Sequence, residues 1–273
     1  MPTHPQVQAY VINLEGATKR WKHIQEIFAA AGMAFERIEA VDGKTLKLEP
    51  GLLAQAWYHS LHGRVTNPSE LGCYLSHLAG LRRFLATAAD LALMCEDDIT
   101  FAPDLPTIIT AALSRPRFWN VLRLSGMSEG HPLRIGPVCG AYDLCTSLGR
   151  IKGTGAYLID RKAAKAFTTR LLPMKLPYDH AIDREWFYNL RAATVVPFPV
   201  NQKQKRFGSS IQTYAQPKLP RWRRWCTTYP YQGANELLRW TFRTGSYLAA
   251  RLHYRSWRSA NARGTSAVPR DRQ

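Results

Sequence analysis

Hydrophobic residues along the first part of the chain fall into short apolar runs that alternate with helical patterns. Residues 7–14 are β-branched and apolar over the length of a strand, and apolar side chains then recur at helical spacing from Trp21 to Ala31. Residues 35–41 form a second strand-like run that ends at the turn Asp42-Gly43. A strand, a helix and a strand within about forty residues predict a βαβ unit and a mostly parallel sheet with flanking helices.

A helix start and a buried strand follow. Asn67 precedes Pro68, and Glu70 comes three residues after the asparagine, which is typical of the first turn of a helix. Residues 91–95 are continuously apolar, as expected of a central strand that is buried on both faces, and Glu96-Asp97-Asp98 follow directly. The pattern further predicts helices over 105–113, 161–172 (capped by Asp160) and 179–190, and strands over 121–124, 156–159 and 194–196, while 51–64 is ambiguous.

Charge divides the chain into two parts. The 273 residues carry 37 Lys+Arg and 20 Asp+Glu, a formal net charge of +17. Residues 216–273 hold twelve of the basic residues and two of the acidic ones, so residues 1–215 have a modest excess. We therefore expect a globular domain over 1–215 and a helical basic tail over 216–273, with an anionic partner for the tail.

The tail mixes arginines with aromatic residues, beginning at Arg221-Trp222-Arg223-Arg224-Trp225. This composition suits a helix that lies in an anionic lipid headgroup layer. A nucleic-acid groove and a helix packed on the core remain open alternatives.

The five cysteines favour a reduced protein, because their number is odd and no two form a C-x-x-C pair. A secretory leader is not recognisable at the N-terminus, and no apolar run reaches the length of about 18 residues that spans a membrane. The expected location is the cytoplasm, peripheral on the inner face of the cytoplasmic membrane.

The triplet Glu96-Asp97-Asp98 is the strongest chemical signal. Three carboxylates at the end of a buried strand repel one another, and ligands of open α/β sheets bind at that edge. A hard divalent cation prefers such oxygen ligands and can bridge a diphosphate. The alternative is one capping aspartate and two solvated carboxylates.

Three other residues are candidates for catalysis. His77 lies on the flank of the apolar helix face, and Asp179 and Asp183 are four residues apart and so share a helix face. Either aspartate is a candidate general base. A semi-buried histidine and a solvated helix face are the simpler interpretations.

Several segments together resemble glycosyltransferase family 25, the lipooligosaccharide galactosyltransferases. The resembling segments, in the order of the family, are Val11-Ile12-Asn13-Leu14 with Arg20, Ala40-Val41-Asp42-Gly43, Glu70-Leu71-Gly72-Cys73-Tyr74-Leu75-Ser76-His77, Glu96-Asp97-Asp98-Ile99, Gly153-Thr154-Gly155-Ala156-Tyr157-Leu158-Ile159 and Leu176-Pro177-Tyr178-Asp179. They cover roughly residues 7 to 212, so the prediction for the tail is based on its composition alone.

The resemblance implies a GT-A-type α/β domain, a UDP-sugar donor (UDP-galactose in this family), Mn²⁺ or Mg²⁺, inversion at the anomeric carbon, and a lipid-linked lipopolysaccharide-type acceptor. It implies that Asp98 and Glu96 hold the metal, and that His77 lies in the pocket. It further implies that Asp179 is the base or an acceptor contact. The residues implied to border the nucleotide are Asn13, Leu14, Arg20, Asp42, Glu96 and Asp97.

Two other classes of protein compete with this interpretation. The basic charge suggests a nucleic-acid-binding protein without catalytic activity, but the charge is concentrated in the tail and no known nucleic-acid-binding motif is present, so nucleic acid is an unlikely partner. A non-catalytic glycan-binding scaffold is the other alternative.

Overall fold

The structure is a computed structural model that describes residues 5–115, 117–202 and 217–265. The helices are α1 (Thr18–Ala30), α2 (Gln55–His62), α3 (Pro68–Leu85), α4 (Leu105–Leu113), α5 (Arg161–Arg170), α6 (Tyr178–Ile182), the 3-10 helix η1 (Glu185–Tyr188), α8 (Arg221–Cys226) and α9 (Thr228–Thr265). The strands are β1 (Val7–Asn13), β2 (Phe35–Glu39), β3 (Leu91–Glu96), β4 (Ile99–Phe101), β5 (Val121–Arg123), β6 (Pro132–Cys139), β7 (Tyr142–Ser147), β8 (Ala156–Asp160), β9 (Ala192–Val196) and β10 (Val200–Gln202).

An eight-stranded sheet in the order β2-β1-β3-β8-β5-β9-β7-β6 forms the centre of the described chain. Strands β1, β2 and β3 pair in parallel, as do β5 and β9. Strand β8 is antiparallel to both β3 and β5, and β7 is antiparallel to both β9 and β6. Because β8 and β7 alone are reversed, six of these eight strands share one direction, which confirms the predicted α/β class with a mostly parallel sheet.

The sheet separates two apolar cores. Tyr74, Leu78 and Phe84 of α3 pack with Phe167 of α5 against one face. Ile24 and Phe28 of α1 pack with Ile108 of α4 against the other. Strand β3 supplies both cores, since Met94 belongs to the first and Leu93 to the second. This two-sided burial explains why residues 91–95 are apolar without interruption.

Most predicted elements are confirmed, and the predicted caps explain two of the helix boundaries. Asn67 Oδ1 accepts from the Ser69 amide at the start of α3, and Asp160 Oδ1 accepts from the Ala163 amide at the start of α5. The ambiguous stretch 51–64 contains α2.

The single helix predicted over 179–190 is wrong. The chain forms the five-residue α6 and then η1, with a break at Asp183-Arg184. Asn189, which closes η1, adopts φ 52°, so the helix could not continue through this residue. The hairpin of β6 and β7 was not predicted, because strand β6 contains two prolines and a glycine.

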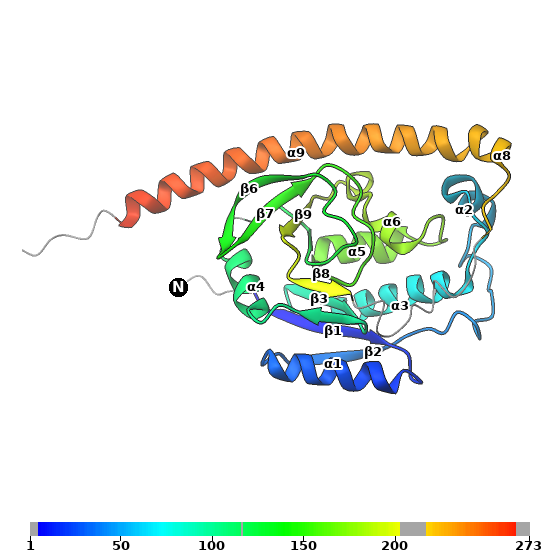
Figure 1. Ribbon diagram of the computed structural model, residues 1–273, viewed down its shortest axis with the longest axis horizontal. Coiled ribbons are helices and arrows are strands. Elements are labelled where there is room, and N and C mark those ends of the chain that lie inside the picture. Colours follow the sequence, from blue (N-terminus) through cyan, green and yellow to red (C-terminus); the bar gives the residue numbers. More distant parts are fainter. Residues whose placement is uncertain (1–4, 116, 203–216, 266–273) are drawn as a thin grey trace, which may run out of the picture.

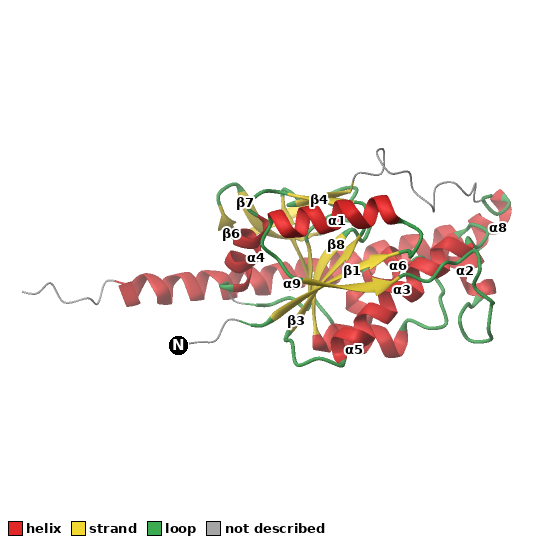
Figure 2. Cartoon of the chain, turned by 90° about the horizontal axis from the view of Figure 1, so that it is seen from below, coloured by secondary structure: helices red, strands yellow, loops and turns green. Residues whose placement is uncertain are grey.

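The described part of the basic tail is helical as predicted, and α9 lies along the edge of the domain, beside β6 and β7, as Figure 1 shows. Figure 2, viewed from below, shows α1 on one side of the sheet and α3 and α5 on the other. The predicted boundary between residues 215 and 216 lies outside the described residues. Among the described helices, none is both long and apolar enough to cross a membrane.

The cysteines are free thiols. Cys95 and Cys145 are buried, as expected for thiols in apolar surroundings, whereas Cys226 is exposed at the end of α8.

Candidate functional site

A cavity of about 350 Å³ opens where β1, β2 and β3 end and α3 begins. Its volume falls in the range of about 300–1,000 Å³ that is usual for small-molecule sites. Its wall comes from segments far apart in the sequence, including Leu14, Asp42, Glu70, Asp98 and Asp179. The sheet therefore assembles the cavity at the edge where ligands of open α/β sheets bind.

The three carboxylates after β3 have different partners. Glu96 accepts hydrogen bonds from the Thr154 hydroxyl and from Gln202 Nε2, the latter at 2.9 Å. Asp97 accepts from Asn13 Nδ2 at 2.7 Å and from Arg20 Nη1 at 3.1 Å. These bonds fix the first two side chains of the triplet.

Asp98 differs from its neighbours. Its Oδ1 atom is buried and has no hydrogen-bond partner among the described residues. Burial, together with the negative charges of Glu96 and Asp97, raises the pKa of Asp98 to about 7. An unpartnered carboxylate oxygen in this setting fits a hard divalent cation, because a cation would offset the charge that burial penalises.

His77 lies directly behind Glu96. Its ring is fully buried, stacks on Tyr178 with centroids 4.2 Å apart, and has Nδ1 within 3.1 Å of the Tyr157 hydroxyl. Nε2 lies 3.5 Å from Glu96 Oε1. Burial by itself would raise the pKa of Glu96, but the interactions with His77 and Thr154 outweigh it and lower the pKa. His77 thus helps to keep Glu96 ionised.

Cys73 belongs to the same wall of the cavity. Its sulfur, a nitrogen of His77 and an oxygen of Glu96 lie within 4.8 Å of one another, which is close enough for one metal ion. Burial raises the pKa of the Cys73 thiol well above its usual value, so without a cation the thiol stays protonated.

The loop after β2 is held against α3 by close backbone contact. A Cβ on Gly43 would lie 1.8 Å from the carbonyl oxygen of Pro68, and one on Gly72 would lie 2.5 Å from that of Val41. Ser76 Oγ also accepts from the Val41 amide at 2.8 Å. These contacts bring Asp42 to the cavity mouth, and they explain why glycine occupies both positions.

Asp179 also lines the cavity. Its Oδ2 accepts from the Gly153 amide at 3.1 Å and its Oδ1 from the His180 amide at 2.9 Å. Burial by itself would raise the pKa of Asp179, but His180 and these amides outweigh it and lower the pKa. Arg123 donates to the carbonyl oxygen of Gly153, which fixes the loop that holds Asp179. Asp179 is therefore an ionised carboxylate at neutral pH.

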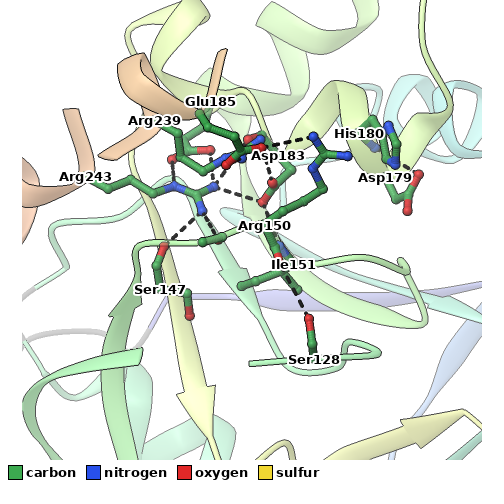
Figure 3. Close-up of polar contacts among 12 residues, drawn as sticks. Ser128, Ser147, Arg150, Ile151, Asp179, His180, Asp183, Glu185, Arg239 and Arg243 are labelled. Atoms are coloured by element: carbon green, nitrogen blue, oxygen red, sulfur yellow. Dashed lines mark hydrogen bonds and ion pairs between the residues drawn. The ribbon is translucent and has the colours of Figure 1, made fainter. Parts of the chain in front are cut away.

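Asp183 lies elsewhere. Its carboxylate accepts from Arg243 Nη2 at 2.9 Å and lies 3.3 Å from Arg239 Nη2, and it does not line the cavity. Figure 3 shows Asp183 among the arginines of α9, with Asp179 apart from them beside His180. This position does not suit a general base. The two residues do not share a helix face because the predicted helix breaks at Asp183.

Of the residues singled out in the sequence, the structure brings eight to the cavity wall: Leu14, Arg20, Asp42, His77, Glu96, Asp97, Asp98 and Asp179. Asn13 lies behind the wall and orients Asp97. Sequence reasoning gave no role to Thr154 or Gln202, although both bind Glu96. Thr154 lies in the Gly-Thr-Gly segment that resembles the family, and this could have indicated a role for it. No feature of the sequence around Gln202 indicated one.

Comparison with known sequences finds similarity to one family. The profile of glycosyltransferase family 25, described as an LPS biosynthesis protein, matches residues 6–131. Over this segment the chain is similar to glycosyltransferase family 25. The matched segment contains β1 to β5, and with them every residue of the carboxylate triplet and His77.

Curated family 25 relatives match a similar stretch. A glycosyltransferase 25 family member of Drosophila pseudoobscura pseudoobscura is 33% identical over 99 residues, which are 34% of this chain and 16% of the relative. One of Anopheles gambiae is 34% identical over 99 residues, which are 34% of this chain and 17% of the relative. The chain thus spans about a sixth of the length of these relatives. The matches favour the family 25 interpretation over a nucleic-acid-binding protein or a non-catalytic scaffold.

Two solved structures are similar in overall outline. A glycosyltransferase involved in glycosylation of the major capsid of PBCV-1 aligns over 77% of this chain and 96% of its own, with 12% identity and a TM-score of 0.42. An inositol-1-phosphate CTP transferase from T. maritima aligns over 74% of this chain and 90% of its own, with 12% identity and a TM-score of 0.37.

Proposed function

We propose that this protein transfers galactose from UDP-galactose to a lipid-linked, lipopolysaccharide-type glycan, with inversion at the anomeric carbon. The observation that carries the proposal is Asp98, whose buried carboxylate oxygen has no partner among the described residues and which lines the cavity together with Glu96 and Asp97. A nucleoside diphosphate is anionic, so such a cavity can accept it when a divalent cation is bound as well.

Asp98 and Glu96 are the residues that would hold Mn²⁺ or Mg²⁺. The bound cation would supply charge neutralisation for the departing diphosphate. Glu96 is already oriented for this role by Thr154 and Gln202. Arg20 is held by Asp97, and with Leu14 it borders the same end of the cavity, where the nucleotide would bind.

Asp179 is the proposed general base. The acceptor hydroxyl would lose its proton to the Asp179 carboxylate as its oxygen forms a bond to the anomeric carbon. The bond between that carbon and the diphosphate oxygen breaks on the opposite face, and its electron pair leaves with UDP, so a single displacement inverts the configuration. General-base assistance of this kind contributes about 10²–10⁴ in rate.

The experiment that tests the donor and the metal is a thermal-shift series on the full chain. UDP-galactose, UDP-glucose, GDP-mannose and CMP-sialic acid are each added with Mn²⁺ and with EDTA. We expect UDP-galactose with Mn²⁺ to raise the Tm most, because a ligand that binds the folded state stabilises it by mass action. Asp98→Asn should abolish the Mn²⁺-dependent part of the shift.

Transfer is then measured with labelled UDP-galactose and a lipooligosaccharide acceptor, and the anomeric configuration of the product is assigned by NMR. A β-linked product from the α-linked donor supports inversion, and an α-linked product contradicts it. Equal shifts with all four donors, or a shift that EDTA leaves unchanged, would contradict the donor or the metal assignment respectively.

A further inference from the structure

Helix α9 has two chemically distinct faces. The side chains buried against the domain recur at helical spacing and comprise Thr228, Asn235, Arg239, Arg243, Ala250 and Tyr254. Their separations of four and seven residues place them on one side of the helix. The opposite side faces away from the domain over the whole length of the helix, which spans the top of the molecule in Figure 1.

Buried ion pairs fix the rotation of α9 about its own axis. Arg243 donates to both carboxylate oxygens of Glu185, at 2.7 and 2.8 Å, and to the carbonyl oxygens of Ser147 and Gly149, at 2.9 and 2.8 Å. Figure 3 shows this guanidinium enclosed by its acceptors. A rotation of the helix would break these bonds, so the outer face is presented in one orientation.

The outer face carries large apolar side chains. Leu237, Leu248 and Leu252 are 70%, 55% and 67% exposed, and Trp240 is 44% exposed. At about 100° per residue these four fall within roughly a third of the helix circumference. Helix α8 continues the surface with Trp222 and Trp225, each 68% exposed. These six large apolar residues are 44% to 70% exposed, and together they form an apolar face that the described chain leaves largely open to solvent.

The charge around these residues is positive. Residues 217–260 contain nine basic residues and one acidic residue, Glu236. Glu236 is paired with Arg150 and Arg239. Arg239 and Arg243 are buried on the inner face, while the exposed cations are Lys218, Arg221, Arg223, Arg255 and Arg258. The described outer face thus combines apolar side chains with uncompensated positive charge.

We propose that the outer face of α8 and α9 docks on a bilayer surface with anionic headgroups, with the axis of α9 parallel to the membrane plane. Leucines and tryptophans enter the boundary between headgroups and acyl chains, and the exposed arginines bind lipid phosphates. The membrane is the inner face of the cytoplasmic membrane, a choice that rests on the lipid-linked acceptor of the proposed function. This inference does not depend on the identity of the donor or of the metal.

Two other occupants fit the face less well. A nucleic acid would neutralise the arginines but would leave Leu237, Leu248 and Leu252 without an apolar partner. A second copy of the chain would bury the leucines but would bring two cationic faces together. Anionic lipid satisfies both the leucines and the arginines.

Flotation of the full chain with vesicles tests the proposal. The vesicles contain phosphatidylethanolamine with about 30% phosphatidylglycerol in one series and phosphatidylcholine alone in the other, so that only the first series carries the negative surface charge that attracts basic segments. We expect partitioning into the anionic vesicles, and a decrease of at least about tenfold for the triple variant Leu237→Gln, Leu248→Gln, Leu252→Gln. Glutamine keeps the helix propensity, and all three side chains are exposed, so the Tm should stay unchanged.

A matched pair of single variants separates docking from general hydrophobicity. Leu252 is 67% exposed on α9, and Leu48 is 61% exposed in the loop before α2. Leu252→Gln should lower vesicle partitioning severalfold, whereas Leu48→Gln should leave it within about twofold. Equal effects of the two substitutions would overturn the proposed face.

The arginines are tested in the same assay. Arg255→Gln and Arg258→Gln should each lower partitioning into anionic vesicles by about fivefold, which corresponds to roughly 1 kcal/mol per basic residue near such a surface. A triple leucine variant that binds vesicles like the unchanged chain would overturn the proposal. The proposal would also be overturned if a single-stranded oligonucleotide retained the unchanged chain as strongly as the anionic vesicles do. A dimer that is stable in salt and that the leucine substitutions dissociate would overturn it as well.

Discussion

Arg243 of α9 and Glu185 of η1 form a bidentate ion pair in the interior, although 58 residues separate them in sequence. Their side chains are 4% and 1% exposed. Two parallel hydrogen bonds between a guanidinium and a carboxylate give both strength and a fixed geometry. The pair joins the basic tail to the domain, so in the described chain α9 is part of the folded unit.

Loss of this arginine should destabilise the protein strongly. Arg243→Met leaves Glu185 and Asp183 buried with less positive charge beside them, and breaking a buried pair from one side costs about 3–5 kcal/mol. We expect the free energy of unfolding, measured by urea denaturation, to fall by about that amount. Arg255→Met, an exposed arginine of the same helix, should change it by less than about 0.5 kcal/mol. Similar small changes in both variants would show that α9 is not anchored through Arg243.

His77 should act on catalysis through Glu96. His77→Phe retains an aromatic ring against Tyr178 but removes the nitrogen that faces Glu96. Groups that orient a metal ligand typically change metal affinity or activity by about 10–100-fold, so we expect the Mn²⁺ concentration for half-maximal activity to rise by that factor.

The control for His77 lies on the same helix. Tyr74 donates a buried hydrogen bond to the Leu171 carbonyl oxygen at 2.6 Å, and it does not line the cavity. Tyr74→Phe should lower the Tm without changing the Mn²⁺ requirement. A His77→Phe enzyme with an unaltered Mn²⁺ requirement and a lower Tm would assign His77 a structural role.

The elements near the site were readable from the sequence because their signals are local. The apolar run before Glu96 and the cap at Asn67 each specify an element within a few residues, and both elements border the cavity. The segments that resemble the family contain most of the residues that line the cavity, from Leu14 to Asp179.

What the sequence did not reveal depends on contacts between distant segments. Gln202 reaches Glu96 because β10 pairs with β4, which follows the triplet. Asp183 was placed on a helix with Asp179 because the four-residue spacing suggests one face. The break before η1 instead turns Asp183 toward Arg239 and Arg243, which lie more than fifty residues later in the chain. The sequence left open whether the tail lies on lipid, binds nucleic acid or packs on the core, and it did not indicate that these two arginines are buried.

Asp98 should make the metal-free protein less stable as the pH rises. Its pKa is about 7 in the folded chain and 3.8 as the reference value, so between these values the folded state holds a proton that the unfolded state has lost. Stability therefore falls as the pH rises from about 4 to about 7 and levels off above. Asp98→Asn removes this dependence, and we expect it to raise the Tm at pH 8 in EDTA by several degrees.

Scanning fluorimetry from pH 4 to pH 9 checks the dependence. Mn²⁺ should stabilise the unchanged chain more at pH 8 than at pH 5.5, because a proton on Asp98 competes with the cation. Parallel pH profiles of the unchanged chain and Asp98→Asn would contradict the raised pKa.

Substitutions of Asp179 and Asp183 should affect different quantities: the first should lower kcat and the second should lower stability. Asp179→Asn retains a side chain of the same size at the cavity but cannot accept the proton of the acceptor hydroxyl. We expect kcat to fall by about 10²–10⁴, with donor affinity unchanged, because Asp179 is assigned to the acceptor hydroxyl and not to the nucleotide.

Asp183→Asn removes a buried charge that pairs with Arg239 and Arg243. We expect it to lower the free energy of unfolding by about 3–5 kcal/mol while kcat, measured well below the Tm, stays close to that of the unchanged enzyme. Both variants are compared by steady-state kinetics and urea denaturation at one temperature. The opposite result would be a loss of turnover in Asp183→Asn at unchanged stability, with normal turnover in Asp179→Asn. It would make Asp183 the base instead of Asp179, and the acceptor would then have to approach from the side of α9 rather than through the cavity.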